Sequence, residues 1–246
     1  MVYPSDPMVR SAIILRTQFS IIPPSMEKAT TAPAATRRRT QEERRNEAER
    51  RVLDSALELV IEKGALRMTL GEVGERAGYS RGLPAHHYGS KEGLLKALIV
   101  HIVEEFRAAR VAAALQPGLD SVLGTMRMYL ERSGRRDRGL LAMHVLFSDV
   151  FVSGGELATA LEAFNDSTLA HFRDQIRIGM RSGEIRADAD PAAQAILILG
   201  ILRGLSAQFY LGPPTRNWKR ALDAALHAVA QELSLRGVTQ GTEQQA

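Results

Sequence analysis

Histidines and carboxylates are the side chains most able to do chemistry in this sequence, which has six histidines and no cysteine. His86 and His87 are adjacent, so on a helix they would point about 100° apart and would not share one metal ion. His101 and Glu104 share a helix face, but the repeated Glu-x-x-His motifs of a carboxylate-bridged metal site are absent. The sequence therefore predicts no metal site and no cofactor.

Other catalytic signatures are also missing. The absence of cysteine excludes disulfides, thiolate zinc sites and cysteine catalysis. Neither the phosphate-cradling Gly-x-x-x-x-Gly-Lys motif nor the Gly-x-Ser-x-Gly elbow occurs. We therefore expect no catalytic residues.

Residues 68–94 carry the pattern of two very short helices followed by a long one. The first helix is expected to begin at Thr69, because its hydroxyl and the Glu72 carboxylate three residues later can form a capping box. Its apolar residues recur at helical spacing on one face: Leu70, Val73 and Ala77.

A tight turn and a second helix follow. Gly78 supplies a turn-permissive backbone, and Ser80 can cap a new helix at once. In the alternative, the second helix starts later, with Pro84 at its first position. Helix, glycine turn and helix within about twenty residues is helix-turn-helix geometry, whose second helix enters a DNA major groove.

This stretch resembles the DNA-binding domain of the TetR family of bacterial transcriptional regulators. The matching residue types cross three element boundaries: Thr69, Ala77, Gly78, Ser80, Gly82, His87, Tyr88, Ser90, Lys91, Glu92 and Leu94. The resemblance covers residues 41 to 100 by motif, and beyond them it rests on helix number and length. Two residues depart from the family pattern, since Pro84 replaces an aliphatic residue and Ala85 replaces a tyrosine that often contacts phosphate.

The resemblance implies double-stranded operator DNA as a partner. Arg81, Leu83 and His86 are expected to face base edges. Thr69, His87 and Lys91 are expected to hold phosphates. The predicted DNA-binding residues also include Ser80 and Gly82.

Basic residues gather ahead of this motif, in a chain of formal net charge +4. Arg37, Arg38 and Arg39 have no acidic neighbours and follow an Ala/Thr/Pro stretch, so we interpret them as an arm that reaches phosphates or a minor groove. The arginines at 44, 45, 50 and 51 alternate with glutamates. For these, a solvated helix face with i,i+4 pairs is an equal alternative.

The chain is expected to be all-α, with an amino-terminal three-helix helix-turn-helix domain and a larger six-helix effector-binding and dimerisation domain. The predicted boundaries are a flexible tail at 1–36, the DNA-binding domain at 37–90, the helical domain at 91–238 and a tail at 239–246. Met26 is an alternative natural start. No apolar run approaches the roughly eighteen residues that cross a bilayer, so we expect a cytoplasmic protein with no membrane partner.

Apolar periodicity and capping signals predict the helix bounds. The helix that precedes the motif should run from about Gln41 to Lys63 and end at Gly64, and Asp190 followed by Pro191 should cap a later one. The expected helices after the motif are 90–115, 119–133, 138–152, 156–181, 191–210 and 216–236.

The last two helices are unusually apolar. Residues 192–210 are apolar nearly all round, which predicts burial on most sides. The family resemblance implies that this helix pair forms a homodimer interface, with an ordinary intrachain core as the alternative. The predicted interface residues are Gly200, Gly204, Trp218, Leu222 and Leu226.

Arg203 is the one charged residue in this apolar helix. A buried guanidinium needs an anion or several carbonyls, so we expect either a structural salt bridge or a bound ligand. Residues on the middle helices could line a cavity with it, or form simple core: Met126, Tyr129, Met143, His144, Phe147, Phe151, Phe164 and Phe172.

Together these features predict a homodimeric transcriptional repressor that a small, mainly apolar effector releases from a palindromic operator. One alternative is a DNA-binding dimer without an effector. The other is a helical enzyme, which the missing catalytic motifs disfavour.

Overall fold

The computed structural model describes residues 40–212 and 217–234, all within one unit of the chain. The predicted arm at Arg37, Arg38 and Arg39 and the predicted tails at 1–36 and 239–246 lie outside these residues. Within them the chain is all-α, as predicted. The helices are α2 (Gln41–Lys63), α3 (Leu70–Arg76), α4 (Leu83–Tyr88), α5 (Lys91–Ala112), α6 (Leu119–Gly134), α7 (Arg138–Ser153), α8 (Glu156–Ser182), α9 (Pro191–Leu211) and α10 (Trp218–Leu233).

Most helix ends match the sequence signals. α2 ends at Gly64, and the Asp190 side chain accepts hydrogen bonds from the first amides of α9, just after Pro191. The clearest difference is α5, which was expected to reach residue 115 but ends at Ala112. Its end falls where Ala114 takes a φ of 49°, a left-handed conformation that alanine rarely adopts and that no local sequence signal predicts.

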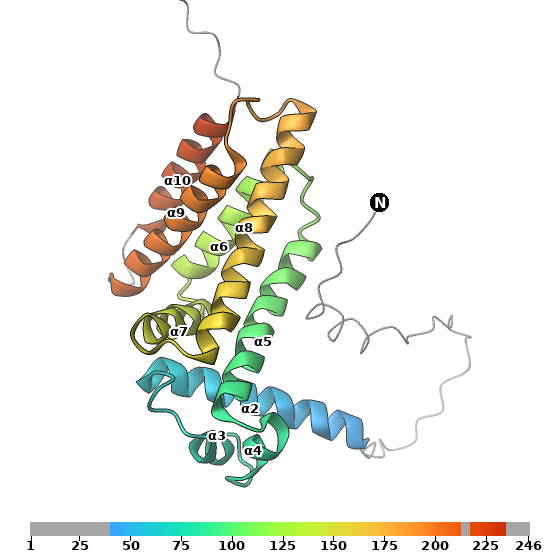
Figure 1. Cartoon of the computed structure of the whole chain (residues 1–246), viewed down its shortest axis with the longest axis vertical. Helices are drawn as coiled ribbons and strands as arrows, with labels where there is room; N and C mark the ends of the chain where they lie inside the picture. Colours follow the sequence, from blue (N-terminus) through green and yellow to red (C-terminus); the bar gives the residue numbers. More distant parts are fainter. Residues whose placement is uncertain (1–39, 213–216, 235–246) are drawn as a thin grey trace, which may run out of the picture. The chain divides into compact units, whose positions relative to one another are not determined.

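α2 lies between two groups of helices (Figure 1). α3 and α4 pack together beside α2, and α7 packs along another side of it. A first core joins all these helices with α5 and the start of α8. It includes Met143 and Leu146 from α7, so the core crosses the predicted domain boundary at residues 90–91.

A second core lies among α6, the later turns of α8, α9 and α10. α8 and α9 run side by side, and α10 packs on α6 (Figure 1). Leu222 and Leu226 of α10 are 3% and 6% exposed in this core.

α9 is less buried than its composition predicted. One side holds Ile198 and Leu202 in the second core, but Ile196 is 63% exposed and Leu197 49% exposed. The prediction that this helix is buried on most sides is therefore wrong for the single chain. The statement that no apolar run approaches membrane-spanning length is also wrong, because α9 is long and apolar enough by length and composition, a test that core helices of soluble proteins also pass.

Candidate nucleic-acid interface

α3 begins with the predicted capping box. The Thr69 hydroxyl accepts a hydrogen bond from the Glu72 amide at 3.3 Å, and the Glu72 carboxylate accepts one from the Thr69 amide at 3.0 Å. Lys63, at the end of α2, forms an ion pair with the same carboxylate. The hydrogen bonds that this carboxylate accepts, first from Lys63 and then from the Thr69 hydroxyl and amide, lower the pKa of Glu72 to about 2.

The turn after α3 depends on two glycines with different roles. Gly78 has a φ of 79°, which favours glycine. Gly74 lies where α3 meets the next segment, and a Cβ there would stand 2.4 Å from the Ser80 carbonyl oxygen. Gly74 was not among the predicted residues, because a glycine inside a helical pattern is tolerated and does not by itself indicate a close approach.

α4 starts later than a Ser80 cap would place it. Its N-cap is Gly82, without a side-chain hydrogen bond, and the Ser80 carbonyl accepts from the Leu83 amide at 3.1 Å. Pro84 is in the first turn, where a missing amide costs little, and it is buried against Gly74. The prediction that Ser80 caps α4 is therefore wrong, and the later start is correct to within one residue.

The junction of α4 and α5 is equally tight. The Ser90 hydroxyl accepts from the Gly93 amide at 3.0 Å, which confirms the predicted cap of α5. A Cβ at Gly93 would stand 2.2 Å from the Tyr88 carbonyl oxygen, so Gly93 is a second close approach that the sequence analysis missed. The Tyr88 ring packs against the first core, and burial raises the pKa of its hydroxyl to about 12.

Most of the predicted DNA-binding residues lie exposed on this surface: Thr69, Ser80, Arg81, Gly82, His86 and His87. Leu83 and Lys91 are half-buried. Leu83 packs partly against the first core, and the Lys91 ammonium donates to the Leu66 carbonyl at 3.0 Å. Arg81 donates to Glu75 at 2.8 Å, and both side chains stay mostly exposed.

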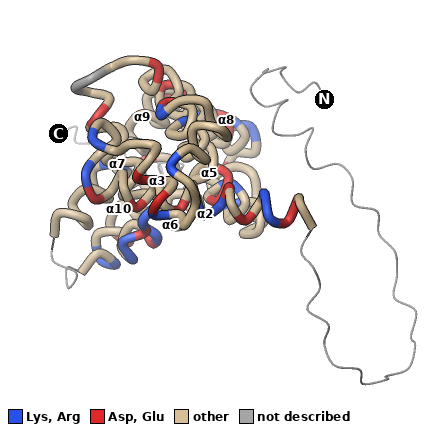
Figure 2. The backbone as a smooth tube through the Cα atoms, turned by 90° about the horizontal axis from the view of Figure 1, so that it is seen from below, with Lys and Arg blue, Asp and Glu red and all other residues tan. Residues whose placement is uncertain are grey.

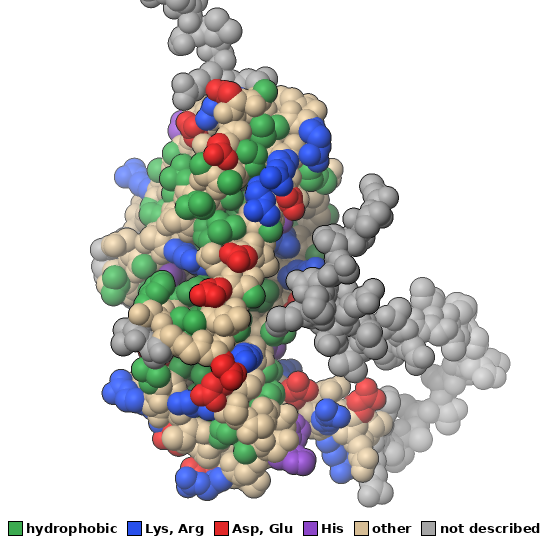
Figure 3. Space-filling view, viewed as in Figure 1, with side chains coloured by type: hydrophobic (Ala, Val, Ile, Leu, Met, Phe, Trp, Pro, Cys, Tyr) green, Lys and Arg blue, Asp and Glu red, His purple; other side chains and the backbone are tan. Residues whose placement is uncertain are grey.

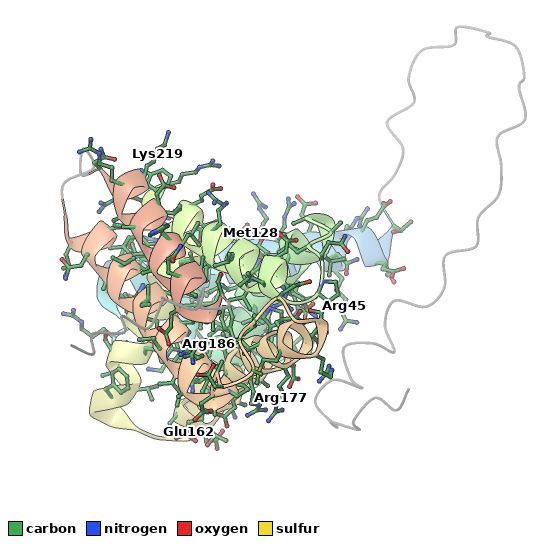
Figure 4. The ribbon with its side chains drawn as sticks, turned by 90° about the horizontal axis from the view of Figure 1, so that it is seen from above. Arg45, Met128, Glu162, Arg177, Arg186 and Lys219 are labelled. Atoms are coloured by element: carbon green, nitrogen blue, oxygen red, sulfur yellow. The ribbon has the colours of Figure 1, made fainter. Side chains whose placement is uncertain are left out.

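Acidic side chains near the motif are neutralised by basic neighbours. Arg76 forms two hydrogen bonds to Glu62, at 2.6 and 2.7 Å, and these lower the pKa of that carboxyl. Figure 2 shows Lys and Arg alternating with acidic residues along α2. Arg45, labelled in Figure 4, is exposed, as are the arginines at 44, 50 and 51, and the Arg51 guanidinium lies 5.8 Å from the centre of the Tyr79 ring.

Basic and histidine side chains therefore remain available at the α3–α4 end of the molecule, where Figure 3 shows them at the surface. Among the described residues, no group of three or more His, Asp or Glu side chains gathers closely enough to hold a metal ion. The surface supplies imidazole groups from His86 and His87 on the short exposed helix α4, and positive charge from Arg81 just before it. Such a surface can bind phosphates and base edges.

A second cluster lies where α6, α7 and α9 meet. The Arg203 guanidinium lies over the Phe147 ring, 4.2 Å from its centre, and its Nη2 is buried without a hydrogen-bond partner. The expected structural salt bridge is absent among residues 40–212 and 217–234. Burial lowers the pKa of Arg203.

Polar side chains complete this cluster. His144 Nε2 lies 2.8 Å from the Ser206 hydroxyl, which also accepts from the Ser133 hydroxyl at 2.9 Å. The pKa of His144 is lowered, first by burial and then by the charge of Arg203. His144 therefore favours its neutral form.

Apart from His144, the residues of the middle helices predicted to line a cavity divide into three groups. Met126, Phe172 and Met143 are buried core residues, which is the simpler alternative for them. Tyr129, Phe147 and Phe164 are partly buried. Phe151 is 83% exposed near the end of α7, so the prediction that it lines a cavity is wrong.

The predicted interface residues also divide. Gly200 and Gly204 lie on the exposed side of α9, with open space where a Cβ would point. Leu222 and Leu226 are in the chain's own core, and Trp218 packs on Gly134 of α6. For the α10 residues, the structure shows the intrachain core that the sequence left as the alternative.

The helix-turn-helix region is similar in sequence to known bacterial regulators. The sequence model described as "Bacterial regulatory proteins, tetR family" matches residues 52–98. The HTH-type transcriptional regulator BetI of Paraburkholderia phymatum is 37% identical over 70 residues, covering 27% of this chain and 36% of that protein. The HTH-type transcriptional regulatory protein RaaS of Mycobacterium tuberculosis is 30% identical over 157 residues, covering 60% of this chain and 64% of that protein.

The fold extends this likeness to most of the chain. The solved structure of SmeT from Stenotrophomonas maltophilia has a TM-score of 0.62 and 22% identity, and the match covers 79% of this chain and 94% of that one. The chain thus spans about a third of BetI's length and 64% of RaaS's. With the helix-turn-helix residues and the helical architecture, these matches support a regulator of the TetR family.

Proposed function

We propose that this protein is a DNA-binding transcriptional repressor that acts as a homodimer and responds to a small effector. The observation that carries the proposal is the α3–α4 unit, in which close approaches at Gly74 and Gly93 hold a short helix with its polar side exposed. BetI and RaaS are named as transcriptional regulators, and SmeT is named as the repressor of a multidrug efflux pump. Because operator DNA is cytoplasmic in bacteria, we place the protein in the cytoplasm.

The DNA contacts proposed for α4 follow from exposure and chemistry. Thr69 and His87 are exposed and can donate to phosphates, once the Thr69 hydroxyl leaves Glu72 Oε2, to which it donates at 2.8 Å. Arg81 and His86 are exposed and can reach base edges. Arg81 must leave Glu75 to do so. That exchange is easy because exposed ion pairs contribute little to stability.

Dimerisation supplies a second DNA-binding domain, which contacts the second half-site of the operator. The proposed interface is the exposed side of α9, where apolar and small residues share one stripe at helical spacing: Ala193, Leu197, Gly200 and Gly204. Two copies joined in this way would read a palindrome whose half-sites lie about 34 Å apart or a little more. One copy alone would make too few phosphate contacts for tight binding.

The effector response is proposed to reach the DNA through α7 as well as α5. α7 carries His144 and Phe147 toward Arg203, and its Arg138 forms an ion pair with Glu58 of α2. A ligand beside Arg203 therefore acts on a helix that also contacts the DNA-binding unit. An effector that prefers the DNA-incompetent arrangement by about 100-fold would shift the equilibrium by roughly 2.7 kcal/mol.

The test is protection of DNA upstream of the protein's own gene by the purified full chain. We expect a palindromic footprint, dimer stoichiometry and affinity that falls steeply with salt. Arg81→Ala should shift the footprint to higher protein concentration, while Arg177→Ala, on an exposed part of α8, should leave it unchanged. Equal binding to the footprinted site and to random DNA would contradict a sequence-specific regulator.

A further inference from the structure

Arg203 is a half-buried cation without an anionic partner among the described residues. Its Nη2 atom is sealed from solvent and makes no hydrogen bond, while its guanidinium plane lies on Phe147. A buried guanidinium atom that lacks an acceptor is costly, and aromatic stacking offsets only part of that cost. Nη2 of Arg203 therefore lacks a hydrogen-bond acceptor.

The described polar groups nearby have other partners. His144, Ser133 and Tyr129 hydrogen-bond with the Ser206 hydroxyl, so these polar atoms satisfy one another. Asp137, whose charge acts on Tyr129 as that of Arg203 does, pairs with Arg132 at 2.8 Å. The acceptor must come from outside the cluster.

The neighbouring cations are also occupied. Arg136 donates to the carbonyls of Phe209, Tyr210 and Gly212 at the end of α9, and Arg132 is held by Asp137. Arg203 is thus the arginine of this group with a donor to spare. A single guanidinium suits a singly charged, planar carboxylate better than a phosphate, which usually gathers several cations.

The apolar side of the site has a definite composition. Phe147 lies against both Arg203 and Phe164, and the centres of the two rings lie 6.3 Å apart. Phe147 and Phe164 are both partly buried. A ligand with its charged end at Arg203 would lay its body against these rings.

We propose that Arg203 binds the carboxylate of an organic acid whose apolar body lies along Phe147 and Phe164. The proposal rests on the proposed function only where it calls this acid the effector. The acid bridges α9 and α7, because Arg203 belongs to one helix and Phe147 to the other. Binding therefore acts directly on the helix that contacts α2.

The first experiment measures binding without DNA. The probes are octanoate and 4-phenylbutyrate, each compared with the alcohol and the amine of the same carbon skeleton, by calorimetry and by thermal unfolding of the full chain. We expect at least one carboxylate to bind and to raise Tm, with its alcohol and amine weaker by about tenfold or more. No preference for either carboxylate over its matched controls would overturn the proposal.

Two variants locate the binding. Arg203→Met keeps an apolar stem and removes the charge, and it should abolish the preference for carboxylate, a loss of about 10- to 100-fold in affinity. Arg203→Lys should keep part of the preference. Arg177→Met, which removes an exposed arginine labelled in Figure 4, is the matched control and should bind like the parent.

The unliganded variants separate a binding role from a structural one. If Arg203 awaits a ligand, Arg203→Met should unfold at the same temperature as the parent or higher, because a buried unpaired charge has been removed. A lower Tm together with unchanged carboxylate affinity would assign Arg203 to structure and overturn the proposal. Operator binding by the unliganded protein is measured separately, so failure of DNA binding is distinguishable from failure of acid binding.

Discussion

Asp149, near the end of α7, accepts a hydrogen bond from the backbone amide of Ala65 at 2.6 Å, joining residues 84 apart in the chain. Ala65 follows α2 and is almost fully buried, so its amide needs this acceptor. A Cβ at Gly64, the residue before it, would lie 3.2 Å from the same carboxylate. The end of α7 is therefore fitted closely to the loop between α2 and α3.

Asp149→Ala should destabilise the fold by about 1–3 kcal/mol, because it leaves the Ala65 amide buried without a partner. Denaturant unfolding followed by circular dichroism measures this. Asp149→Asn keeps an acceptor oxygen and should lose less. If the two variants unfold alike, the hydrogen bond to Ala65 contributes little to stability.

Gly74→Ala should destabilise the DNA-binding unit by about 1–3 kcal/mol, because the new methyl group meets the Ser80 carbonyl of the following turn. Gly82→Ala is the matched control, since its φ is −84° and a Cβ there meets nothing within 4 Å. Thermal unfolding should show a lower Tm for the first variant alone. A parent-like Tm for Gly74→Ala would mean that the two segments can separate at no cost.

These close approaches show what sequence can predict and what it cannot. Capping at Thr69, Ser90 and Asp190 depends on residues three or fewer apart, so local pattern was sufficient. The role of Gly74 depends on a carbonyl six residues away across a turn. Its identity was visible in the sequence, but the segment that it meets was not.

The same distinction applies to the apolar faces of α9 and α10. Periodicity correctly marked Leu222 as part of an apolar stripe, but it could not say whether α6 or a second copy covers that stripe. Arg203 stood out because of its charge, whereas its place over Phe147 depends on how α7 and α9 pack. Residue type suggested the sites, and tertiary packing decided their partners.

Arg81→Ala should cost about 1–3 kcal/mol on the operator and little on random DNA, because Arg81 is proposed to read base edges. Lys91→Ala should weaken both and reduce the salt slope by about one unit, as expected for a phosphate contact. Fluorescence anisotropy over a salt series measures both variants. Equal losses of affinity on the two DNAs for Arg81→Ala would show that Arg81 contacts phosphates and does not read bases.

Glu75→Gln tests whether the ion pair restrains Arg81. The change removes a negative charge beside the proposed groove contact and releases the guanidinium. Operator affinity should rise, and the gain should disappear in the double variant with Arg81→Ala. An equal gain in the presence of Arg81→Ala would show that only the net charge matters.

The Lys63–Glu72 pair should make the fold sensitive to acid. Glu72 has a pKa of about 2 in the folded chain against an ordinary 4.5, so its folded pKa is depressed. Its contribution to stability is fully present above pH 4.5 and is lost as the pH falls toward 2. Glu72→Gln should therefore lose less stability than the parent between these pH values, measured by urea unfolding at each pH.

Leu197→Glu should split the proposed dimer without unfolding the chain. Leu197 is 49% exposed on the free side of α9, so a charge there is harmless to one copy but costly when a second copy covers it. Sedimentation should show a monomer, and thermal unfolding should show that this monomer is still folded. Operator affinity should fall at least about 100-fold, because each half-site alone supplies too little binding energy. Leu222→Glu provides the contrast, since Leu222 is 3% exposed in the second core and the same charge there should unfold the helical domain. A Leu197→Glu variant that stays dimeric and binds the operator as tightly as the parent would show that this side of α9 is not the interface.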